Sequence, residues 1–468
     1  GAGAATPVRL ALPEPRAWTP EDPHLYELDV RLVDVASGQV VDRVSSYAGL
    51  RRVGRRRDSA GHLQFTLNGK LLFHFGALDQ GWWPDGLLTP PSDEALLSDI
   101  VFQKAAGFNM IRKHVKVEPR RFYFHCDRLG MLVWQDHVSA GHGPRWSKLK
   151  AFPTHPRRDG SWSRVEHRQF MRELDAMVGQ LESHPSIVVW TPFNEAWGQH
   201  RTLEVGRWLQ WRDPSRLVNL ASGGNFWRAG HIADAHAYPD PSFPDNSRRF
   251  DRYVKVVGEF GGHGWAVPGH SHGESAADGV AWGYGGLPPD LDGLRQRYNR
   301  SIAALVDLRI RGIAAGVYTQ VSDVETEVNG LLTYDRAVAK MSASELRALH
   351  AQLVEPCWGE GSELEVGVDF GGHDCMCTAG SDDGSGFRRS GVGGPEACAH
   401  LCWWSRAPFF SFDTSQASCW CKVSDVGRRA DAPTFASGRS RRPWCRELDA
   451  PPGDRVSTAR GAGAPAAA

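Results

Sequence analysis

The sequence predicts an α/β protein whose centre is a (β/α)8 TIM barrel, and three observations support this. Eight short apolar segments, many rich in β-branched residues, are typical of buried parallel strands. Amphipathic stretches such as 92–106 and 165–183 lie between them, and the first begins with Ser92 and acidic residues, a helix-start signal. Eight strand–helix units over about 280 residues fit such a barrel. The predicted strands are 72–77, 109–114, 131–135, 187–194, 217–221, 232–238, 254–260 and 316–321.

A doubly wound parallel sheet is the alternative fold. It is disfavoured because no Gly-rich phosphate-binding loop follows the first strand.

The barrel is expected to occupy only the middle of the chain. Before it, 24–34 and 40–47 alternate apolar and polar residues, which predicts a hairpin of half-buried strands. A second hairpin is predicted around Asn68 and Gly69. After Glu355 the helical periodicity ends, and Gly, Ser, Asp and Cys dominate. We therefore expect a β-rich domain at 1–66, the barrel at 67–355, a Cys-rich module at 356–447 and a disordered tail at 448–468.

Composition limits the kinds of partner. The 468 residues include 54 Lys and Arg and 54 Asp and Glu, so the net charge is zero. This balance disfavours nucleic acid and anionic membrane surfaces as partners. No apolar run is long enough for a membrane-spanning helix. The 18 tryptophans fit either stacking against sugar rings or packing in a core.

Eight of the nine cysteines fall between residues 357 and 445. An even, dense set in a short segment favours a disulfide framework, whose connectivity the sequence leaves open. Zinc is the alternative, but the two C-x-C pairs lack the usual ligand spacing. Disulfides need an oxidising compartment, so we expect a secreted or lumenal protein. No signal peptide is visible after Gly1, and we expect one to have been removed or to lie upstream.

Polar side chains lie at the carboxyl ends of the predicted strands, where barrel proteins place their chemistry. Two carboxylates stand out among them. Glu195 ends the run IVVWTPFNEAW, and Glu259 lies in VKVVGEFGG, where small residues allow close approach of a ligand. The other candidates are Asp79, Arg112, His114, Trp134, Asp136, Asn194, His236 and Tyr238, with Trp197 just beyond.

The two glutamates follow strands four and seven, which face each other across an eight-stranded barrel. They can therefore converge on one bond, and two carboxylates on either side of a glycosidic bond are what its hydrolysis requires. For either glutamate alone, the alternative is a structural salt bridge to an arginine such as Arg112.

Several segments resemble the family 2 glycoside hydrolases, the β-galactosidase and β-glucuronidase family. The similarity covers residues 17–350, about three-quarters of the chain. The segment WTPEDPHLYELDV at 18–30 resembles the family's immunoglobulin-like sandwich. The others are LNGKLLFHFGALDQGWWPDG (67–86), GFNMIRKHVKVEPRRFYFHCDRLGMLVWQD (107–136), HPSIVVWTPFNEAWG (184–198), VVGEFGG (256–262) and QVSDVETEVNGLLTYDR (320–336).

The resemblance implies a retaining β-glycosidase that acts on terminal β-linked sugars without a cofactor. Glu195 matches the family's general acid/base and Glu259 its nucleophile. Asn194 would hold the sugar 2-hydroxyl. The remaining residues implied to bind substrate are Arg112, His114, Asp79, Trp134, Asp136, His236, Tyr238 and Trp197.

The sequence departs from the family at both ends. Only part of the sandwich precedes the barrel, which suggests an N-terminally truncated protein with unpaired strand edges. The Cys-rich module faintly resembles PAN/apple-like domains, which would bind carbohydrate or protein. The alternative is a disulfide-linked module that has no binding function.

Three further expectations concern the alternative function, a metal site and an acidic loop. A catalytically decayed carbohydrate-binding protein on the same barrel is the alternative function. No metal is predicted, although His263, His270 and His272 make one conceivable. The acidic run Asp323, Glu325 and Glu327 is expected to form a solvated or ion-paired loop.

Overall fold

The computed structural model describes residues 10–146, 159–244, 248–272 and 281–354, together with the backbone of short strands between 365 and 439. The chain divides into two compact units, residues 1–355 and 356–468, and each is described by itself.

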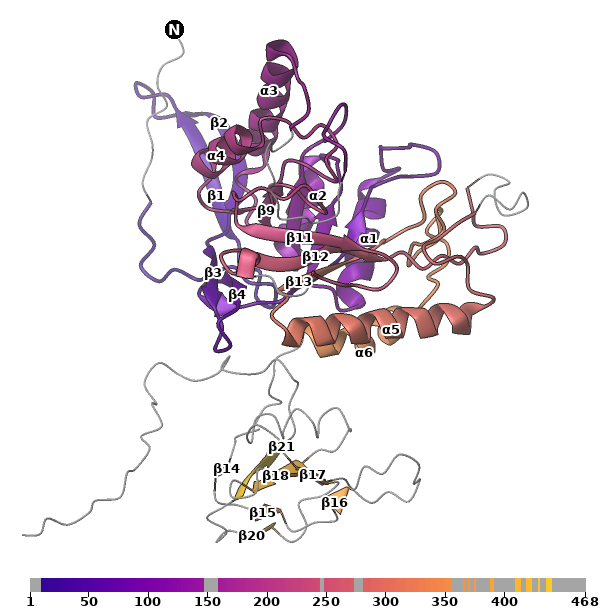
Figure 1. Cartoon of the computed structure of the whole chain (residues 1–468). Coiled ribbons are helices and arrows are strands. Elements are labelled where there is room, and N and C mark those ends of the chain that lie inside the picture. The colour runs from indigo at the N-terminus through magenta and orange to yellow at the C-terminus, as the bar shows by residue number, and fades with distance from the viewer. Residues whose placement is uncertain are drawn as a thin grey trace, which may run out of the picture. The chain divides into compact units, whose positions relative to one another are not determined.

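The first unit contains the predicted barrel, which confirms the TIM-barrel part of the predicted fold (Figure 1). Its eight parallel strands are hydrogen-bonded in the order β10-β9-β8-β7-β6-β13-β12-β11. The two end strands approach each other where the backbone N–H of His231 donates to the carbonyl of Val218 at 2.9 Å. The strands are β6 (His74–Asp79), β7 (Met110–Lys113), β8 (Leu132–Asp136), β9 (Ile187–Thr191), β10 (Leu217–Val218), β11 (Ile232–Ala237), β12 (Val254–Gly261) and β13 (Ala315–Thr319).

The helices begin and end where the sequence signals lie. The Ser92 side chain accepts a hydrogen bond from the backbone N–H of Ala95, and Ser163 with Glu166 forms a complete capping box. Gly130 ends its helix in the left-handed conformation that glycine adopts without strain. The helices are α1 (Asp93–Ala105), α2 (Arg120–Leu129), α3 (Arg164–Leu181), α4 (Thr202–Arg212), α5 (Leu291–Ile310) and α6 (Ala343–Val354).

The strand–helix alternation is less regular than predicted. No helix joins β10 to β11 in the described structure, and a single 3-10 turn, η1 (Arg248–Phe250), lies between β11 and β12. The β10–β11 connection contains Gly223, Gly224 and Gly230, and two of these have positive φ angles. A short Gly-rich segment of this kind disfavours a helix, which explains the difference.

The amino-terminal end of the barrel is filled by aromatic side chains. Strands β3 (Val53–Arg57), β4 (Leu63–Leu67) and β5 (Lys70–Leu71) form a small antiparallel sheet there. Phe65 of β4 stacks on His74 with ring centroids 4.3 Å apart, and both contact Trp134. Because this end is occupied by a core, chemistry is confined to the opposite, carboxyl-terminal end.

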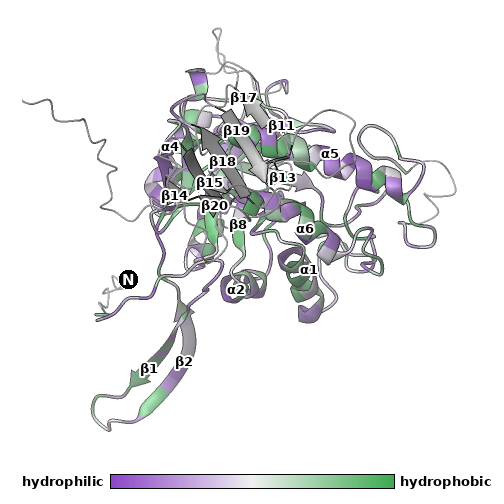
Figure 2. Ribbon diagram, turned by 90° about the horizontal axis from the view of Figure 1, so that it is seen from below, coloured by the Kyte–Doolittle hydropathy of each residue, from purple (hydrophilic) through white to green (hydrophobic). Residues whose placement is uncertain are grey.

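The predicted first hairpin is present as β1 (Tyr26–Val33) and β2 (Val40–Ala48), a two-stranded antiparallel sheet. It reaches out beyond the body of the barrel (Figure 2). Within the described residues it pairs with no further strand, so the immunoglobulin-like sandwich stays a prediction.

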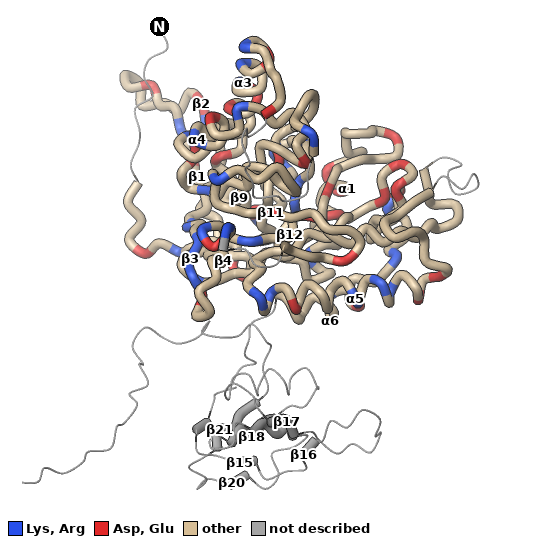
Figure 3. The backbone as a smooth tube through the Cα atoms, viewed as in Figure 1, with Lys and Arg blue, Asp and Glu red and all other residues tan. Residues whose placement is uncertain are grey.

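The charged residues are distributed as the balanced composition leads one to expect. Lys and Arg are interspersed with Asp and Glu over the described backbone, apart from a run of three arginines in β3 (Figure 3). No helix in the described part of the chain is both long and apolar enough to cross a membrane.

The second unit is described only as backbone. Its strands pair in the order β14-β21-β18-β19-β16, with β17 beside β19 and a separate β15-β20 pair. The predicted disulfides lie outside the described side chains. The strands are β14 (Glu365–Val366), β15 (Asp369–Phe370), β16 (Asp374–Cys375), β17 (Arg388–Ser390), β18 (Phe409–Asp413), β19 (Ser418–Lys422), β20 (Arg428–Arg429) and β21 (Phe435–Arg439).

Candidate active site

A buried arginine organises the carboxyl-terminal end of the barrel. Alternate residues of a barrel strand face the interior, so Met110 of β7 lies in the core and Arg112 lies one layer above it. The guanidinium of Arg112 is fully buried and contacts Asp136 with two nitrogens, Nε at 3.3 Å and Nη2 at 3.0 Å. Nη1 donates to Oε1 of Glu259 at 3.1 Å, and Nη2 donates to Oδ1 of Asn194 at 2.8 Å. One cation thus ties three strands together.

The electrostatic balance of this group is set by its two buried carboxylates. Burial alone would lower the pKa of Arg112, but Asp136 and then Glu259 outweigh it and raise the pKa above its ordinary value. Arg112 in turn lowers the pKa of Asp136 against the opposing effect of burial. The guanidinium therefore remains charged and keeps both partners ionised.

Glu259 lies near the end of β12 and is almost fully buried. Its Oε2 accepts a hydrogen bond from the hydroxyl of Tyr238 at 2.7 Å and lies 3.2 Å from Nδ1 of His236. Burial raises the pKa of Glu259, but His236 and Arg112 more than offset this, and the pKa falls below its usual value. His236 and Arg112 therefore stabilise the ionised form of Glu259 in its buried position.

Glu195 is presented by a strained turn beyond β9. Its φ angle is 48° and that of Ala196 is 69°, in the left-handed region that non-glycine residues rarely adopt. The Glu195 N–H donates to the carbonyl of Ser222 at 2.9 Å, and Ser222 N–H donates to the carbonyl of Phe193 at 3.0 Å. These bonds hold the turn and leave the Glu195 carboxylate partly exposed at the mouth. Strain of this kind clusters at functional sites.

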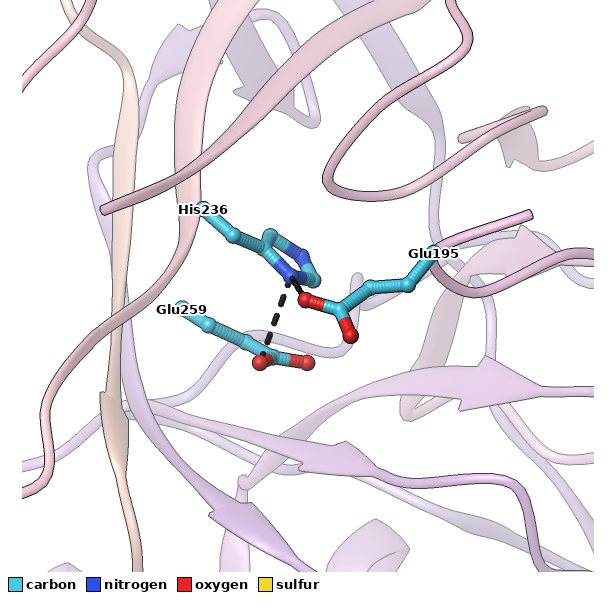
Figure 4. A group of neighbouring side chains, drawn as sticks. All are labelled: Glu195, His236 and Glu259. Carbon is cyan, nitrogen blue, oxygen red and sulfur yellow. Dashed lines mark hydrogen bonds and ion pairs between the residues drawn. The ribbon is translucent and has the colours of Figure 1, made fainter. Parts of the chain in front are cut away.

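His236 bridges the two glutamates (Figure 4). Its Nδ1 lies 2.8 Å from Oε1 of Glu195 and 3.2 Å from Oε2 of Glu259, so this one nitrogen faces both carboxylates and carries a proton that it donates. Burial lowers the pKa of His236, but Glu259 and the hydrogen bond to Glu195 raise it above its ordinary value. Oxygen atoms of Glu195 and Glu259 and a ring nitrogen of His236 all lie within 4.8 Å of one another. The pair of carboxylates can therefore act on a single bond.

Most of the predicted site residues lie in this cluster. His114 is at its border, where Nδ1 lies 3.2 Å from Oδ2 of Asp136. Trp197 is 58% exposed close to Glu195 in the sequence, and its backbone N–H donates to the carbonyl of Asn194 at 2.9 Å. The predicted residues joined by these contacts are Arg112, His114, Asp136, Asn194, Glu195, His236, Tyr238 and Glu259.

Two predicted residues lie elsewhere. The carboxylate of Asp79 forms a buried ion pair with Lys113 at 3.0 Å, and Lys113 also pairs with Glu118. Trp134 faces the barrel interior one layer below Asp136, where its indole N–H donates to His74. In the structure Asp79 neutralises a buried lysine and Trp134 fills the core, and substrate binding by these two residues stays a prediction.

Asp234 is a site residue that is absent from the predicted set. This buried carboxylate accepts hydrogen bonds from Asn219 at 2.7 Å, Ser222 at 2.6 Å and the N–H of Gly258 at 2.7 Å. Ser222 also lies 2.9 Å from Nε2 of His236. Asp234 thus holds Asn219 and Ser222 in place, and Ser222 in turn contacts His236. The sequence contains a signal for this residue, because Asp234 and His236 are two residues apart on β11 and therefore share the interior face.

Glu195, His236 and Glu259 are also the described set whose donor atoms are close enough to hold a metal ion. However, the position between them is spanned by the hydrogen bonds of His236, and Arg112 adds a positive charge beside Glu259. The histidines considered as metal ligands have other partners: His263 bonds Ser301 at 2.8 Å, and His270 pairs with Asp335 at 2.8 Å.

The fold and the site define a TIM-barrel protein with two convergent carboxylates at the mouth. Comparison with known proteins finds a similarity to one family in two parts of the chain. Residues 88–249 match the model described as Glycosyl hydrolases family 2, TIM barrel domain, and residues 2–51 match Glycosyl hydrolases family 2. These parts of the chain are therefore similar to glycoside hydrolases of family 2.

Curated relatives show the same similarity. A beta-galactosidase of Psychromonas ingrahamii is 31% identical over 217 residues, which cover 46% of this chain and 19% of that protein. A beta-galactosidase of Halalkalibacterium halodurans is 29% identical over 215 residues, which cover 45% and 20%. The chain thus spans about a fifth of the length of these relatives.

Solved structures share the fold. An FMN-binding beta-glucuronidase from Facaelibacterium prausnitzii L2-6 has a TM-score of 0.54 and 18% identity, covering 76% of this chain and 54% of that one. A GH2 beta-galacturonidase from Eisenbergiella tayi bound to galacturonate has a TM-score of 0.52 and 17% identity, covering 74% and 61%.

Proposed function

We propose that this protein is a retaining β-glycosidase that hydrolyses terminal β-linked sugars through a covalent glycosyl-enzyme. The observation that carries the proposal is the approach of Glu195 and Glu259 oxygens to within 4.8 Å. Retaining glycosidases hold their carboxyl groups about 5–5.5 Å apart, and inverting enzymes hold them about 6.5–9.5 Å apart to admit a water molecule. The beta-galactosidases to which the barrel is similar support the same class of reaction.

In the first step, a carboxylate oxygen of Glu259 attacks the anomeric carbon. The bond from that carbon to the leaving oxygen breaks, and protonated Glu195 gives its proton to this oxygen. In the second step, ionised Glu195 takes a proton from water as the water oxygen attacks the anomeric carbon. The ester bond to Glu259 then breaks, which restores both side chains.

The surroundings of the two glutamates suit these roles. Glu259 is buried and held ionised by Arg112 and His236, as a nucleophile must be. Glu195 is partly exposed at the mouth, where a leaving group departs and water enters. Since Oδ1 of Asn194 accepts from Arg112, its amide NH2 group remains to donate to a sugar hydroxyl.

The test is hydrolysis of nitrophenyl β-galactoside, glucoside, mannoside and glucuronide by the full chain and by Glu259→Gln. We expect turnover of at least one substrate by the wild type, and loss of that turnover by at least about 10³-fold in the variant. Glu173→Gln, an exposed residue on α3, is the matched control. Equal activity of Glu259→Gln and wild type would exclude the proposed nucleophile. Sugar binding without any turnover would instead favour the decayed carbohydrate-binding protein.

A further inference from the structure

A third carboxylate lies beside the proposed site, on the loop after β13. The acidic run at 323–327 was expected to be solvated or ion-paired, but its members differ. Asp323 is buried and pairs with Lys340 at 2.6 Å, and Glu325 is exposed. Glu327 is half-buried and has no cationic partner in the described part of the chain; its Oε1 accepts a hydrogen bond from Nδ2 of Asn329 at 2.8 Å.

Backbone contacts join Glu327 to the wall of the site. Trp282 N–H donates to the carbonyl of Thr326, and Val328 N–H donates to the carbonyl of Trp282, each at 3.0 Å. This pairing places Glu327 beside the segment that carries Tyr284. The ring of Tyr284 stacks on Tyr238 with centroids 3.7 Å apart, and the hydroxyl of Tyr238 bonds Glu259.

Side-chain amides form a second connection. Oδ1 of Asn329 accepts a hydrogen bond from Gln320 at 2.9 Å, and Oε1 of Gln320 accepts one from Gln80 at 2.9 Å. Gln320 follows Thr319, whose hydroxyl lies 2.7 Å from that of Tyr238. Glu327 and Asn329 are therefore held in place on the loop after β13 and are connected through Gln320 and Thr319 to Tyr238.

Carboxylate charges act on the side chains of this wall. Burial raises the pKa of Tyr284, and the charges of Glu327, Glu259 and Glu195 raise it further, so all three carboxylates act on one phenol. Burial and the charge of Glu259 likewise raise the pKa of Glu327. The cations on neighbouring described loops are already paired: Lys113 and Lys116 with Glu118, Arg336 with Asp99 and Lys340 with Asp323.

We infer that Glu327 and Asn329 form a subsite that accepts sugar hydroxyl groups and excludes carboxylated sugars. This inference rests on the proposed glycosidase function and names its substrate class: a neutral β-glycoside, in contrast to the uronides named for the structural neighbours. A uronate would bring a second negative charge against Glu327, which has no cationic partner among the described residues, whereas Glu259 is offset by Arg112 and His236. A neutral sugar would instead donate a hydroxyl hydrogen bond to the Glu327 carboxylate and accept one from an amide.

The test compares kcat/KM for nitrophenyl β-galactoside, glucoside and mannoside with that for the β-glucuronide and β-galacturonide, at a pH where uronates are ionised. For the wild type we expect the best neutral substrate to exceed either uronide by at least about 100-fold, because like charges in a partly buried site repel strongly. A uronide preferred by the wild type would overturn the inference and leave the proposed glycosidase intact.

The variant Glu327→Gln keeps the shape and removes the charge. We expect it to lower kcat/KM for the neutral substrate by about 10-fold or more and to raise the uronide-to-neutral ratio by about 10-fold. Glu325→Gln, exposed on the same loop, is the matched control and should leave the ratio unchanged. An unchanged ratio in Glu327→Gln with a normal melting temperature would also overturn the inference.

Calorimetric binding of galactose, glucose, glucuronate and galacturonate to the same proteins gives a readout independent of turnover. Tighter binding of neutral sugars, with a preference that Glu327→Gln reduces, would support the subsite even if no substrate were hydrolysed. In that case the proposed hydrolysis would fail and the subsite would stand. Tighter binding of a uronate by the wild type would exclude the subsite.

Discussion

The Nδ1 atom of His236 lies 2.8 Å from Oε1 of Glu195, so a single imidazole connects the mouth of the barrel to its buried carboxylate Glu259. The two glutamates lie 64 residues apart in the chain, Glu195 in the turn beyond β9 and Glu259 on β12. Glu259 is buried and ion-paired, whereas Glu195 is partly exposed. This difference is the physical basis for giving them different roles.

Changing Glu195 should affect substrates according to their leaving group. In Glu195→Gln we expect kcat/KM for phenyl or alkyl glycosides to fall by about 10²–10⁴-fold, because a poor leaving group needs the proton. A dinitrophenyl glycoside leaves without protonation, and its glycosylation step should fall by less than about 10-fold. The measurement is kcat/KM across a series of aglycone pKa values. Equal losses over the whole series would contradict the acid/base role.

Removing the Arg112 guanidinium should destabilise the protein as well as inactivate it. In Arg112→Met, the buried carboxylates of Asp136 and Glu259 lose their shared cation, which we expect to cost about 3–5 kcal/mol in the free energy of unfolding. Denaturant unfolding measures this change. Arg207→Met, at an exposed position on α4, should change stability by no more than about 0.5 kcal/mol. Similar stabilities for the two variants would show that Arg112 is not the organising cation.

His236 should set the pH range of activity. Its charge is the largest of the interactions that lower the pKa of Glu259, so His236→Asn should raise that pKa and move the acidic limb of kcat/KM to higher pH. His62→Asn, at the opposite end of the barrel near Gly312, should leave the limb in place. The pH profiles of the three proteins decide this point, and an acidic limb that stays fixed in His236→Asn would refute the coupling.

Stability should show the same linkage with the expected signs. The pKa of Glu259 is lowered by folding, so its contribution is present above its ordinary value of 4.5 and is lost as the pH falls through the folded value. The pKa of His236 is raised, so its contribution is present below 6.5 and is lost as the pH rises through the folded value. His236→Asn should therefore flatten the dependence of the melting temperature on pH in both ranges. An unchanged pH dependence in this variant would count against both assignments.

Trp197 should contribute to aglycone binding by stacking, since 58% of its surface is exposed beside the acid/base turn. In Trp197→Ala we expect KM for aryl glycosides to rise by about 3- to 10-fold, with the melting temperature unchanged. Trp211→Ala removes a similarly exposed indole on α4, at 76% exposure, and should leave KM unchanged. Equal effects of the two substitutions would argue against a stacking role for Trp197.

Much of this architecture could be read from local sequence patterns. Short apolar segments predicted the eight barrel strands, and Ser92 marked a helix start that the structure confirms. The positions of Arg112, His236 and Glu259 at strand ends followed from the rule that parallel strands deliver their carboxyl ends to one face. These features depend on neighbours in the chain, which a sequence displays directly.

Other features depend on contacts between distant segments. Alternation along β8 cannot tell whether Trp134 or Asp136 reaches the mouth, because both face inward; the depth of the core beneath them decides it. Asp79 and Glu327 are both carboxylates near strand ends, yet only Asp79 has a lysine against it. Charge pairing of this kind arises where loops far apart in sequence meet in space, so only the tertiary structure could separate the structural carboxylates from those open to a ligand.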